Sequence, residues 1–270
     1  EIVDTVRDHY GKSKVDLLIS THPDQDHIQG LNSIVENIEV GEVWIHDKSN
    51  HSNSASGLDR IIQSRNFLPF TFLQEDSAIM KSYGQAESFI AKVDGLGIPR
   101  YEPFTRTTFG CFTVVGPTVE FYEMTLADYQ SDSDLSNADV FLKRFEEPTA
   151  TQLLNEALGH HYVIDDDEEN TPTNESSVIV AATTDDLKLL FTGDAGVRAI
   201  TEARRTYEIS DLDWLDVPHH GSKHNVNSEM LEYFKAKKAY ISAKGSKKHP
   251  SRSVVDALKR NGAKVVLDGQ

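Results

Sequence analysis

Cysteine and long apolar runs are both scarce in this sequence. Its 270 residues include a single cysteine, Cys111, which excludes an internal disulfide and any zinc site built on several cysteines. Without disulfide chemistry a cytoplasmic location is favoured. No apolar run is long enough to cross a bilayer, and no signal peptide is recognisable. We therefore expect a soluble globular protein in which histidine and carboxylate side chains hold any bound metal.

Positive charge is also in short supply. The chain has 27 lysine and arginine residues against 43 aspartate and glutamate residues, a net charge of −16 with neutral histidines. Such an excess repels nucleic-acid phosphates unless a local basic patch or bound cations reverse the field. The basic residues gather late in the sequence, where Lys247, Lys248 and Arg252 stand close together. That cluster predicts a phosphate-bearing substrate, with nucleic acid as one candidate partner, at one face of the protein.

The order of the predicted elements indicates an α/β fold. The segment "VDLLIS" reads as a buried strand, helical spacing of apolar residues follows it, and "EVWIH" reads as the next strand. A helix is predicted at 56–67 and a strand at 108–118. Residues 176–194 predict a hairpin, after which helices and strands alternate to the C-terminus. The length fits one domain, 1–270, with an unassigned insert at about 48–170 through which a protein partner could dock.

The most informative motif is His-Pro-Asp-Gln-Asp-His, directly after the first predicted strand. Polar groups so concentrated are tolerated on burial only when they pair or surround a cation. His22, Asp24 and Asp26 alternate and so can face one ion, while His27 can face a second. The alternative is a helix cap, in which Asp24 or Asp26 accepts hydrogen bonds from free N–H groups. Because a cap needs only one such residue, the pattern favours a metal site.

Three further motifs place histidine or aspartate at predicted strand ends, the edge at which open α/β layers hold their sites. Asp194 in "FTGDAG" is read either as a carboxylate that bridges two metals or as part of a capped helix start at Ala195. Of the adjacent His219 and His220, we expect at least one to bind metal and the other to orient substrate or a ligand. For His249, a functional role and a surface position are equally open.

In order, "STHPDQDHIQGL", "NESSVIV", "LLFTGDA", "LDVPHHGSKHN" and "ISAKGSKKHPS" resemble the metallo-β-lactamase-fold hydrolases. More narrowly, they are similar to the hydrolase domain of ComEC-type DNA-uptake proteins and its free-standing relatives. The resemblance implies an αββα sandwich whose N-terminal strands are missing from this chain. Asp24 departs from the family's usual histidine and favours oxygen-loving ions such as Mn. The family's middle histidine is absent, and Asn174 and Ser177 stand near its place, where we expect substrate contacts. The implied metal ligands are His22, Asp24, Asp26, His27, Asp194 and His219 (or His220).

These expectations combine in a metal-dependent phosphodiesterase or nuclease that uses one or two divalent ions, Zn or Mn. A bound cation lowers the pKa of water from about 16 toward 7. We assign Asp26 to orient that water or accept its proton, and His220 or His249 to stabilise charge on the leaving group. Substrate is expected to contact Ser222, Lys247 and Lys248. Two alternatives stay open: an ester, lactone or amide hydrolase, and a metal-binding interaction module without turnover.

Overall fold

The computed structural model describes residues 2–51, 73–134, 170–243 and 249–268, with side chains described except at 73–82 and 127–134. Its strands are β1 (Lys14–Ile19), β2 (Glu39–Trp44), β3 (Arg100–Tyr101), β4 (Thr108–Phe109), β5 (Phe112–Gly116), β6 (Ile179–Thr183), β7 (Lys188–Phe191), β8 (Trp214–Asp216), β9 (Lys238–Ile241) and β10 (Lys264–Leu267). The α-helices are α1 (Ile2–Asp4), α2 (Gln25–Ile28), α3 (Leu31–Asn37), α5 (Leu73–Gly95), α6 (Val119–Asp134), α9 (Pro172–Glu175), α10 (Val197–Thr206), α11 (Ser228–Phe234) and α12 (Arg252–Arg260). Short turns of other helix types are η1 (Thr5–His9), η2 (Lys48–Asn50) and η4 (Pro218–Gly221).

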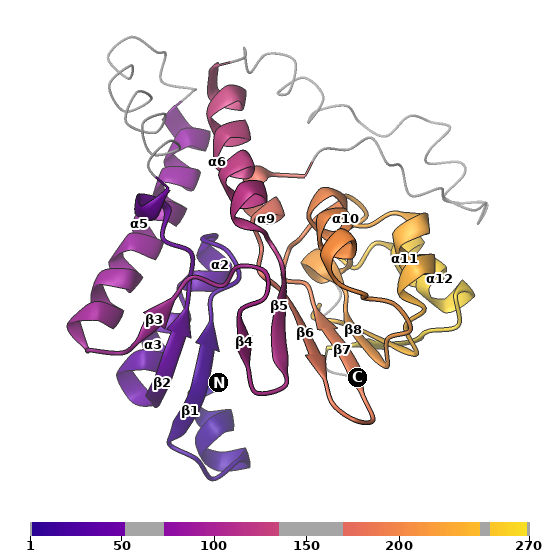
Figure 1. The fold of residues 1–270 in the computed structure, drawn as a ribbon, viewed down its shortest axis with the longest axis horizontal. Coiled ribbons are helices and arrows are strands. Elements are labelled where there is room, and N and C mark those ends of the chain that lie inside the picture. Colours follow the sequence, from indigo (N-terminus) through magenta and orange to yellow (C-terminus); the bar gives the residue numbers. More distant parts are fainter. Residues whose placement is uncertain (1, 52–72, 135–169, 244–248, 269–270) are drawn as a thin grey trace.

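The strands form two sheets. One has three strands in the order β1-β2-β3, all parallel. The other has seven strands in the order β10-β9-β8-β7-β6-β5-β4, antiparallel from β4 to β7 and parallel from β7 to β10. Helix α5 lies beside the three-stranded sheet, and α10, α11 and α12 lie beside the seven-stranded one (Figure 1). The predicted α/β class is therefore confirmed.

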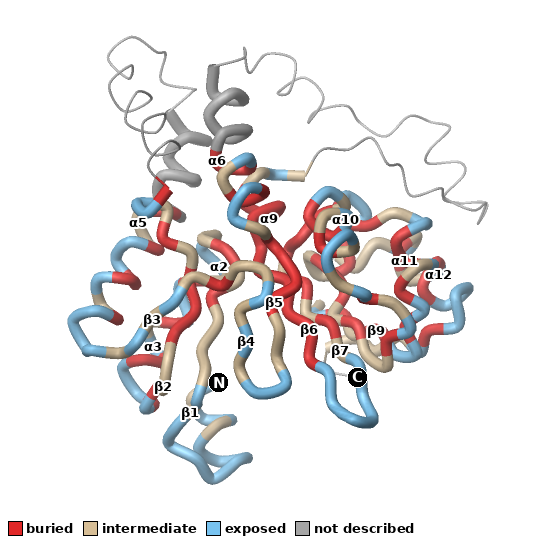
Figure 2. The backbone as a smooth tube through the Cα atoms, viewed as in Figure 1, coloured by how far each residue is buried: buried red, intermediate tan, exposed pale blue. Residues whose placement is uncertain are grey.

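Side-chain alternation divides the apolar residues among separate cores. On β6, Ile179 and Ala181 belong to a core shared with α10, α11 and α12. Val178, just before β6, and Val180 point the other way and pack with Trp44 of β2. A third core lies between β2 and the helices α2, α3 and α5. Figure 2 shows buried backbone in the middle strands and exposed backbone at the β6–β7 turn and on outer helix faces.

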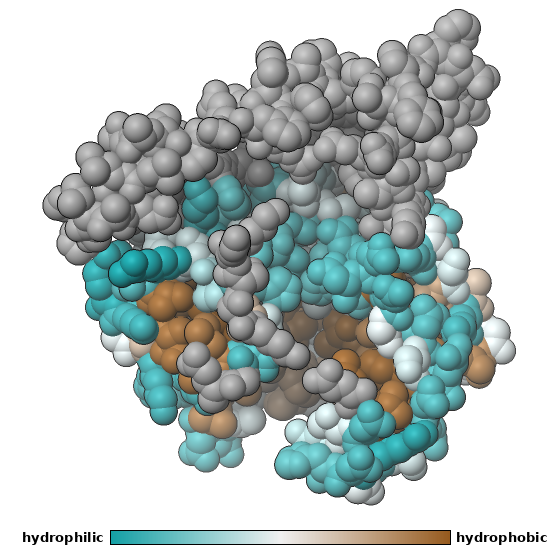
Figure 3. Space-filling model, turned by 180° about the vertical axis from the view of Figure 1, so that it is seen from behind, coloured by the Kyte–Doolittle hydropathy of each residue, from teal (hydrophilic) through white to brown (hydrophobic). Residues whose placement is uncertain are grey.

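The core between the two sheets is not fully closed. Seen from behind, the molecule is hollowed between two lobes, and hydrophobic side chains are visible there (Figure 3). The hydrophobic residues packed against this core are only partly buried: Leu17, Ile19, Phe109, Phe112 and Phe191. Part of the contact between the sheets therefore remains accessible to solvent.

Most predicted elements are confirmed, including the β6–β7 hairpin. The predicted strand at 108–118 is wrong, because it is two strands that turn at Gly110 and Cys111. β1 is half-buried rather than buried, since it is an edge strand. The stretch 48–170, expected as an insert, supplies β3 to one sheet and β4 and β5 to the other, and the helix predicted at 56–67 lies outside the described residues. Among the described residues, no helix combines the length and apolar character needed to span a membrane.

Candidate metal centre

Three loops meet at one end of the two sheets. Two of them follow β7 and β8, which are adjacent and parallel, so their carboxyl ends share an edge. The third follows β1 of the other sheet. The Val178 backbone N–H donates to the Thr21 carbonyl at 2.9 Å, and the His219 N–H donates to the Gly193 carbonyl at 3.1 Å. These backbone hydrogen bonds hold together loops that are far apart in the sequence.

The backbone at this junction adopts conformations that L-residues rarely take. Gly193 has a φ of +53°, and a Cβ atom there would lie 3.1 Å from Thr21 Cβ, so glycine permits the close approach. His219 and His220 are both left-handed, with φ values of 47° and 55°. Non-glycine residues in this region carry strain of about 1–3 kcal/mol each and gather at functional sites. The strained turn of η4 presents both rings to the junction.

Asp194 lies at the centre of the converging side chains. Its side chain is 7% exposed, and Oδ2 lies 3.4 Å from His27 Nε2. The same oxygen lies 3.8 Å from His22 Nε2 and 3.7 Å from His219 Nε2. The structure thus brings three of the predicted metal ligands around a fourth, the Asp194 carboxylate.

His22 tests whether these residues fit a cation. Its side chain is fully buried, and Nε2 has no hydrogen-bond partner among the described residues. Nδ1, at the other edge of the ring, contacts Thr21 Oγ1 at 3.1 Å and Ser177 Oγ at 3.3 Å. Burial lowers the pKa of His22 to about 3, so the ring is neutral at physiological pH. A buried, neutral nitrogen that faces a carboxylate fits a bound metal ion.

The charges of Asp194 and His27 depend on each other. Burial raises the pKa of Asp194, but the hydrogen bond and charge of His27, with His22 and His219 adding to them, hold that pKa at about 2. Burial in turn lowers the pKa of His27, but the hydrogen bond to Asp194 and its charge raise it overall. In the absence of metal, a proton on His27 therefore neutralises Asp194. A divalent cation would displace that proton.

A second group of potential ligands adjoins the first. One ligand atom from each of Asp26, His27 and His220 lies within 4.8 Å of the others. The Asp26 side chain is 72% exposed, and its Oδ2 lies 3.8 Å from His27 Nε2. The His220 ring is held by contacts of Nδ1 with the Ser242 carbonyl at 2.8 Å and Oγ at 3.0 Å. The two groups share His27 and lie side by side, so the junction offers ligands for one cation or two.

The alternative interpretation of the aspartates as helix caps is wrong for Asp24 and Asp194. Asp24 is in the N-cap position of α2, but its side chain makes no capping hydrogen bond. Its Oδ2 lies 3.7 Å from His22 Nε2 instead. Burial raises the pKa of Asp24, and the charges of Asp26 and Asp194 add to the rise. Helix α10 begins at Val197, beyond Asp194, so both carboxylates face the histidines.

Three residues predicted to contact substrate are buried behind the centre. Ser177 is 0% exposed, and its Oγ accepts from the Asp194 backbone N–H at 3.3 Å and contacts His22 Nδ1. Asn174 Nδ2 lies 3.3 Å from His219 Nδ1. The Ser222 hydroxyl accepts from the backbone N–H of His224 at 3.2 Å. These side chains support the ligands and the turn because they pack on the side away from Nε2.

The remaining predicted site residues lie at the rim or outside the described residues. The His249 ring stacks against His219 with a centroid separation of 5.5 Å. The Arg252 side chain is 79% exposed, and its Nε lies 3.8 Å from Asp256 Oδ2. Lys247 and Lys248 lie outside the described residues. Of the predicted basic cluster, the structure therefore describes only Arg252.

Sequence reasoning did not single out Thr21, Asn225 or Asp216. Thr21 Oγ1 contacts Nδ1 of His27 at 3.4 Å as well as that of His22. Asn225 is fully buried against His219. Burial raises the pKa of Asp216 to about 6, opposed by His220 and reinforced by Asp194. All three are near the predicted motifs, and only their contacts and burial in the folded protein distinguish them from ordinary neighbours.

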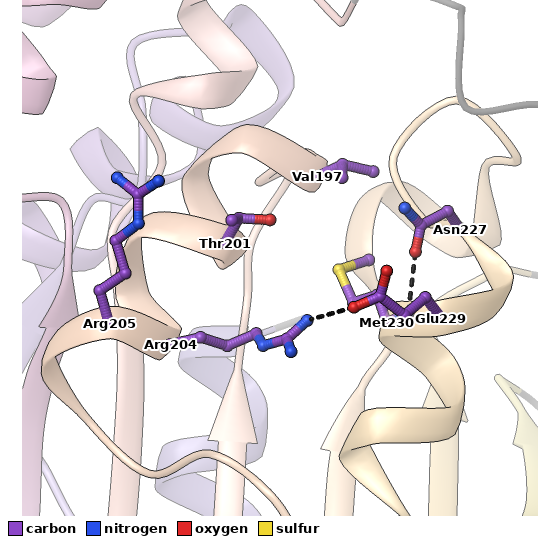
Figure 4. Close-up of a pocket in the computed structure, with 7 residues that line it drawn as sticks. All are labelled: Val197, Thr201, Arg204, Arg205, Asn227, Glu229 and Met230. Carbon is purple, nitrogen blue, oxygen red and sulfur yellow. Dashed lines mark hydrogen bonds and ion pairs between the residues drawn. The ribbon is translucent and has the colours of Figure 1, made fainter.

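A separate groove of about 340 Å³ lies between α10 and the start of α11 (Figure 4). Arg204 points across it toward Glu229, with Nη1 3.4 Å from Oε1, and its guanidinium lies 3.8 Å from the centre of the Tyr233 ring. Arg205 pairs with Glu202 at 2.8 Å. Both arginines are thus neutralised by carboxylates, and none of the converging ligands lines this groove. The chemistry of the molecule therefore points to the loop junction.

No protein-family model matches this chain, and no curated protein is significantly similar to it. Its function has to be inferred from the side chains that converge around Asp194.

Proposed function

We propose that this protein is a metal-dependent hydrolase of the metallo-β-lactamase type, and that it acts as a phosphodiesterase or nuclease. The proposal includes an αββα sandwich. Its support is the core between the sheets around Trp44, with helix-packed cores on the opposite faces of both sheets. The motifs that carry the family resemblance lie, where the structure describes them, after β1, β7, β8 and β9 and before β6.

One observation carries the proposal: three imidazole nitrogens surround one buried carboxylate oxygen at 3.4 to 3.8 Å. Hydrogen bonding alone leaves His22 Nε2 unsatisfied, and an unmet buried polar atom costs about 1–3 kcal/mol. Divalent cations at this centre would satisfy that nitrogen and give the other rings a partner. The first position would be held by His22, Asp24, Asp194 and His219, and the second by Asp26, His27 and Asp194, with His220 beside it as a group that does not bind the cation.

When bound, divalent cations supply Lewis-acid activation of water and of a phosphoryl oxygen. The protein's own groups carry the remaining tasks. Asp26 is the most exposed carboxylate at the junction and orients the attacking water or takes its proton. His220, held by Ser242, faces the same side and stabilises charge on the departing oxygen. The buried side chains of Ser177 and Asn174 contact the Nδ1 atoms of His22 and His219 and so hold these two rings in one orientation.

A phosphodiester is the favoured substrate because a pair of divalent cations, when bound, would supply charge stabilisation for both the attacking and the leaving oxygen. Asp194 would serve both positions, because its Oδ2 lies near His22 of the first and His27 of the second. The net charge of −16 disfavours long-range attraction of a polyanion. We therefore expect turnover of small phosphodiesters and of single-stranded DNA near the cation site, without tight general binding of nucleic acid.

The test is hydrolysis of bis-p-nitrophenyl phosphate and of single-stranded DNA with Mn²⁺ or Zn²⁺. Activity is expected to disappear with EDTA and in Asp194→Ala, and to persist in Asp186→Ala, which changes an exposed aspartate at the β6–β7 turn. Hydrolysis that survives both EDTA and Asp194→Ala contradicts the proposal. Activity confined to a parallel panel of esters, lactones and amides would retain the metal but replace the substrate class. Stoichiometric metal binding without turnover on either panel would indicate an interaction module.

A further inference from the structure

We infer that Asn225 holds the proton of His219 on Nδ1, so that the Nε2 lone pair faces Asp194 and the proposed cation. The inference rests on the proposed metal site. A neutral imidazole can ligate a metal only through a nitrogen that has no proton, so the tautomer decides whether His219 is a ligand. Asn225 is 0% exposed, and its amide reaches two groups at the junction.

The orientation of the Asn225 amide follows from one group that can only accept. The Asp194 backbone carbonyl lies 2.8 Å from one end of that amide, and a carbonyl oxygen has no proton to donate. The NH₂ group must therefore face Asp194. This places Oδ1 at the other end, 3.0 Å from His219 Nδ1. Because Oδ1 is also only an acceptor, the ring must donate from Nδ1.

A competing contact would favour the opposite tautomer. Asn174 Nδ2 lies 3.3 Å from the same His219 Nδ1 and would donate to it if that nitrogen carried a lone pair. The Asn174 NH₂ group already donates to Asn170 Oδ1 at 3.0 Å. If His219 Nδ1 carried a lone pair, Asn225 Oδ1 would face that lone pair at 3.0 Å and would have no donor inside the protein. The shorter contact and the buried acceptor make Nδ1–H the favoured form.

Asn225 is thus a positioning residue that acts through His219. It joins the ring of one ligand to the backbone of another, across the loops that follow β7 and β8. Removing a residue that hydrogen-bonds to a metal-binding histidine typically weakens metal binding by about 10–100-fold. We expect a loss of that size when Asn225 is replaced by an apolar residue.

The first experiment uses the wild-type protein without metal. Long-range ¹⁵N–¹H NMR correlations of ¹⁵N-histidine-labelled protein report which ring nitrogen carries the proton, and His219→Gln assigns the signal. We expect His219 to carry it on Nδ1 at a pH at which the ring is neutral. A proton on Nε2 overturns the inference, whatever the variants do. This measurement does not depend on metal binding, so it separates the inference from the proposed function.

The second experiment compares variants by chelator competition with Mn²⁺ and Zn²⁺. Asn225→Leu is expected to weaken binding by about 10–100-fold and to give mixed His219 tautomers. Asn225→Asp keeps an acceptor for the ring but removes the NH₂ donor to the Asp194 carbonyl, so its readout is the tautomer, and Nδ1–H is expected to be preserved whatever happens to metal affinity. Asn227→Ala is the matched control, because Asn227 Oδ1 caps α11 by accepting from the Met230 N–H at 2.8 Å (Figure 4). Unchanged metal affinity in Asn225→Leu, or an Nδ1–H tautomer that persists in Asn225→Leu and is lost in Asn225→Asp, contradicts the inference.

Discussion

Replacing Asp194 with asparagine tests the centre most directly, because the shape is kept and the charge is removed. The pKa of Asp194 is about 2, against an ordinary value of 3.8. At 1.36 kcal/mol per unit, this difference corresponds to about 2 kcal/mol of stabilisation by its surroundings. The side chain is only 7% exposed, so solvent screens little of that energy. Without metal, we expect Asp194→Asn to be less stable than wild type by about 2 kcal/mol at pH 6.

The sign of the effect follows from the two partners. A depressed carboxyl pKa gives stability that is present above pH 3.8 and is lost as the pH falls toward 2. The raised pKa of His27 gives stability that is present below 6.5 and is lost as the pH rises through the raised value. The difference between Asp194→Asn and wild type should therefore be largest between about pH 4 and 6.5, and smaller at pH 9.

Urea unfolding with EDTA or with Mn²⁺ measures both the charge effect and the metal. At a free metal concentration of 100 times Kd, binding stabilises the wild type by about 2.7 kcal/mol, and Asp194→Asn should gain almost none of this. Asp186→Asn, at the exposed β6–β7 turn, is expected to behave as wild type. A variant that matches wild-type stability at pH 6 and gains equally from Mn²⁺ would refute the shared centre.

Three more outcomes are expected. Burial lowers the pKa of His46 to about 3, so unfolding takes up a proton below pH 6.5. Between pH 7 and pH 4, the free energy of unfolding of wild type, measured with urea, should therefore fall by up to about 3 kcal/mol relative to that of His46→Phe. A difference that does not depend on pH would contradict this. Zn²⁺ binding at pH 6.5 should release protons from His27, whose pKa is raised, seen as different calorimetric heats in buffers of different ionisation enthalpy, whereas equal heats would argue against it. Gly196→Ala places a Cβ against the buried Glu175 Oε1 and should lower thermal stability by about 1–3 kcal/mol, while Gly30→Ala, with nothing within 4 Å of its Cβ, should not; equal melting temperatures would refute the packing argument.

The positions of the ligands were predictable because each depends on local sequence. An apolar run followed by His22 and Asp24 indicates a strand that ends in a polar loop, and the Gly193–Asp194 turn ends another strand in the same way. Carboxyl ends of adjacent parallel strands share an edge, so convergence of Asp194 and His219 could be expected before the structure was known. The break at Gly110 was not anticipated, since a continuous apolar pattern conceals a tight turn.

What the sequence by itself determined is the kind of chemistry: imidazoles and carboxylates at strand ends, one cysteine, and an α/β order of elements. The tertiary structure alone decided which nitrogen of each histidine ring faces Asp194. Ser177 and Asn174 were predicted to contact substrate, but their side chains pack against the Nδ1 atoms of His22 and His219. Asn225 has no motif of its own and gains its role from a carbonyl 31 residues earlier in the chain. Spacing encodes the direction of a side chain only within one element, whereas contacts between loops depend on how the two sheets pack.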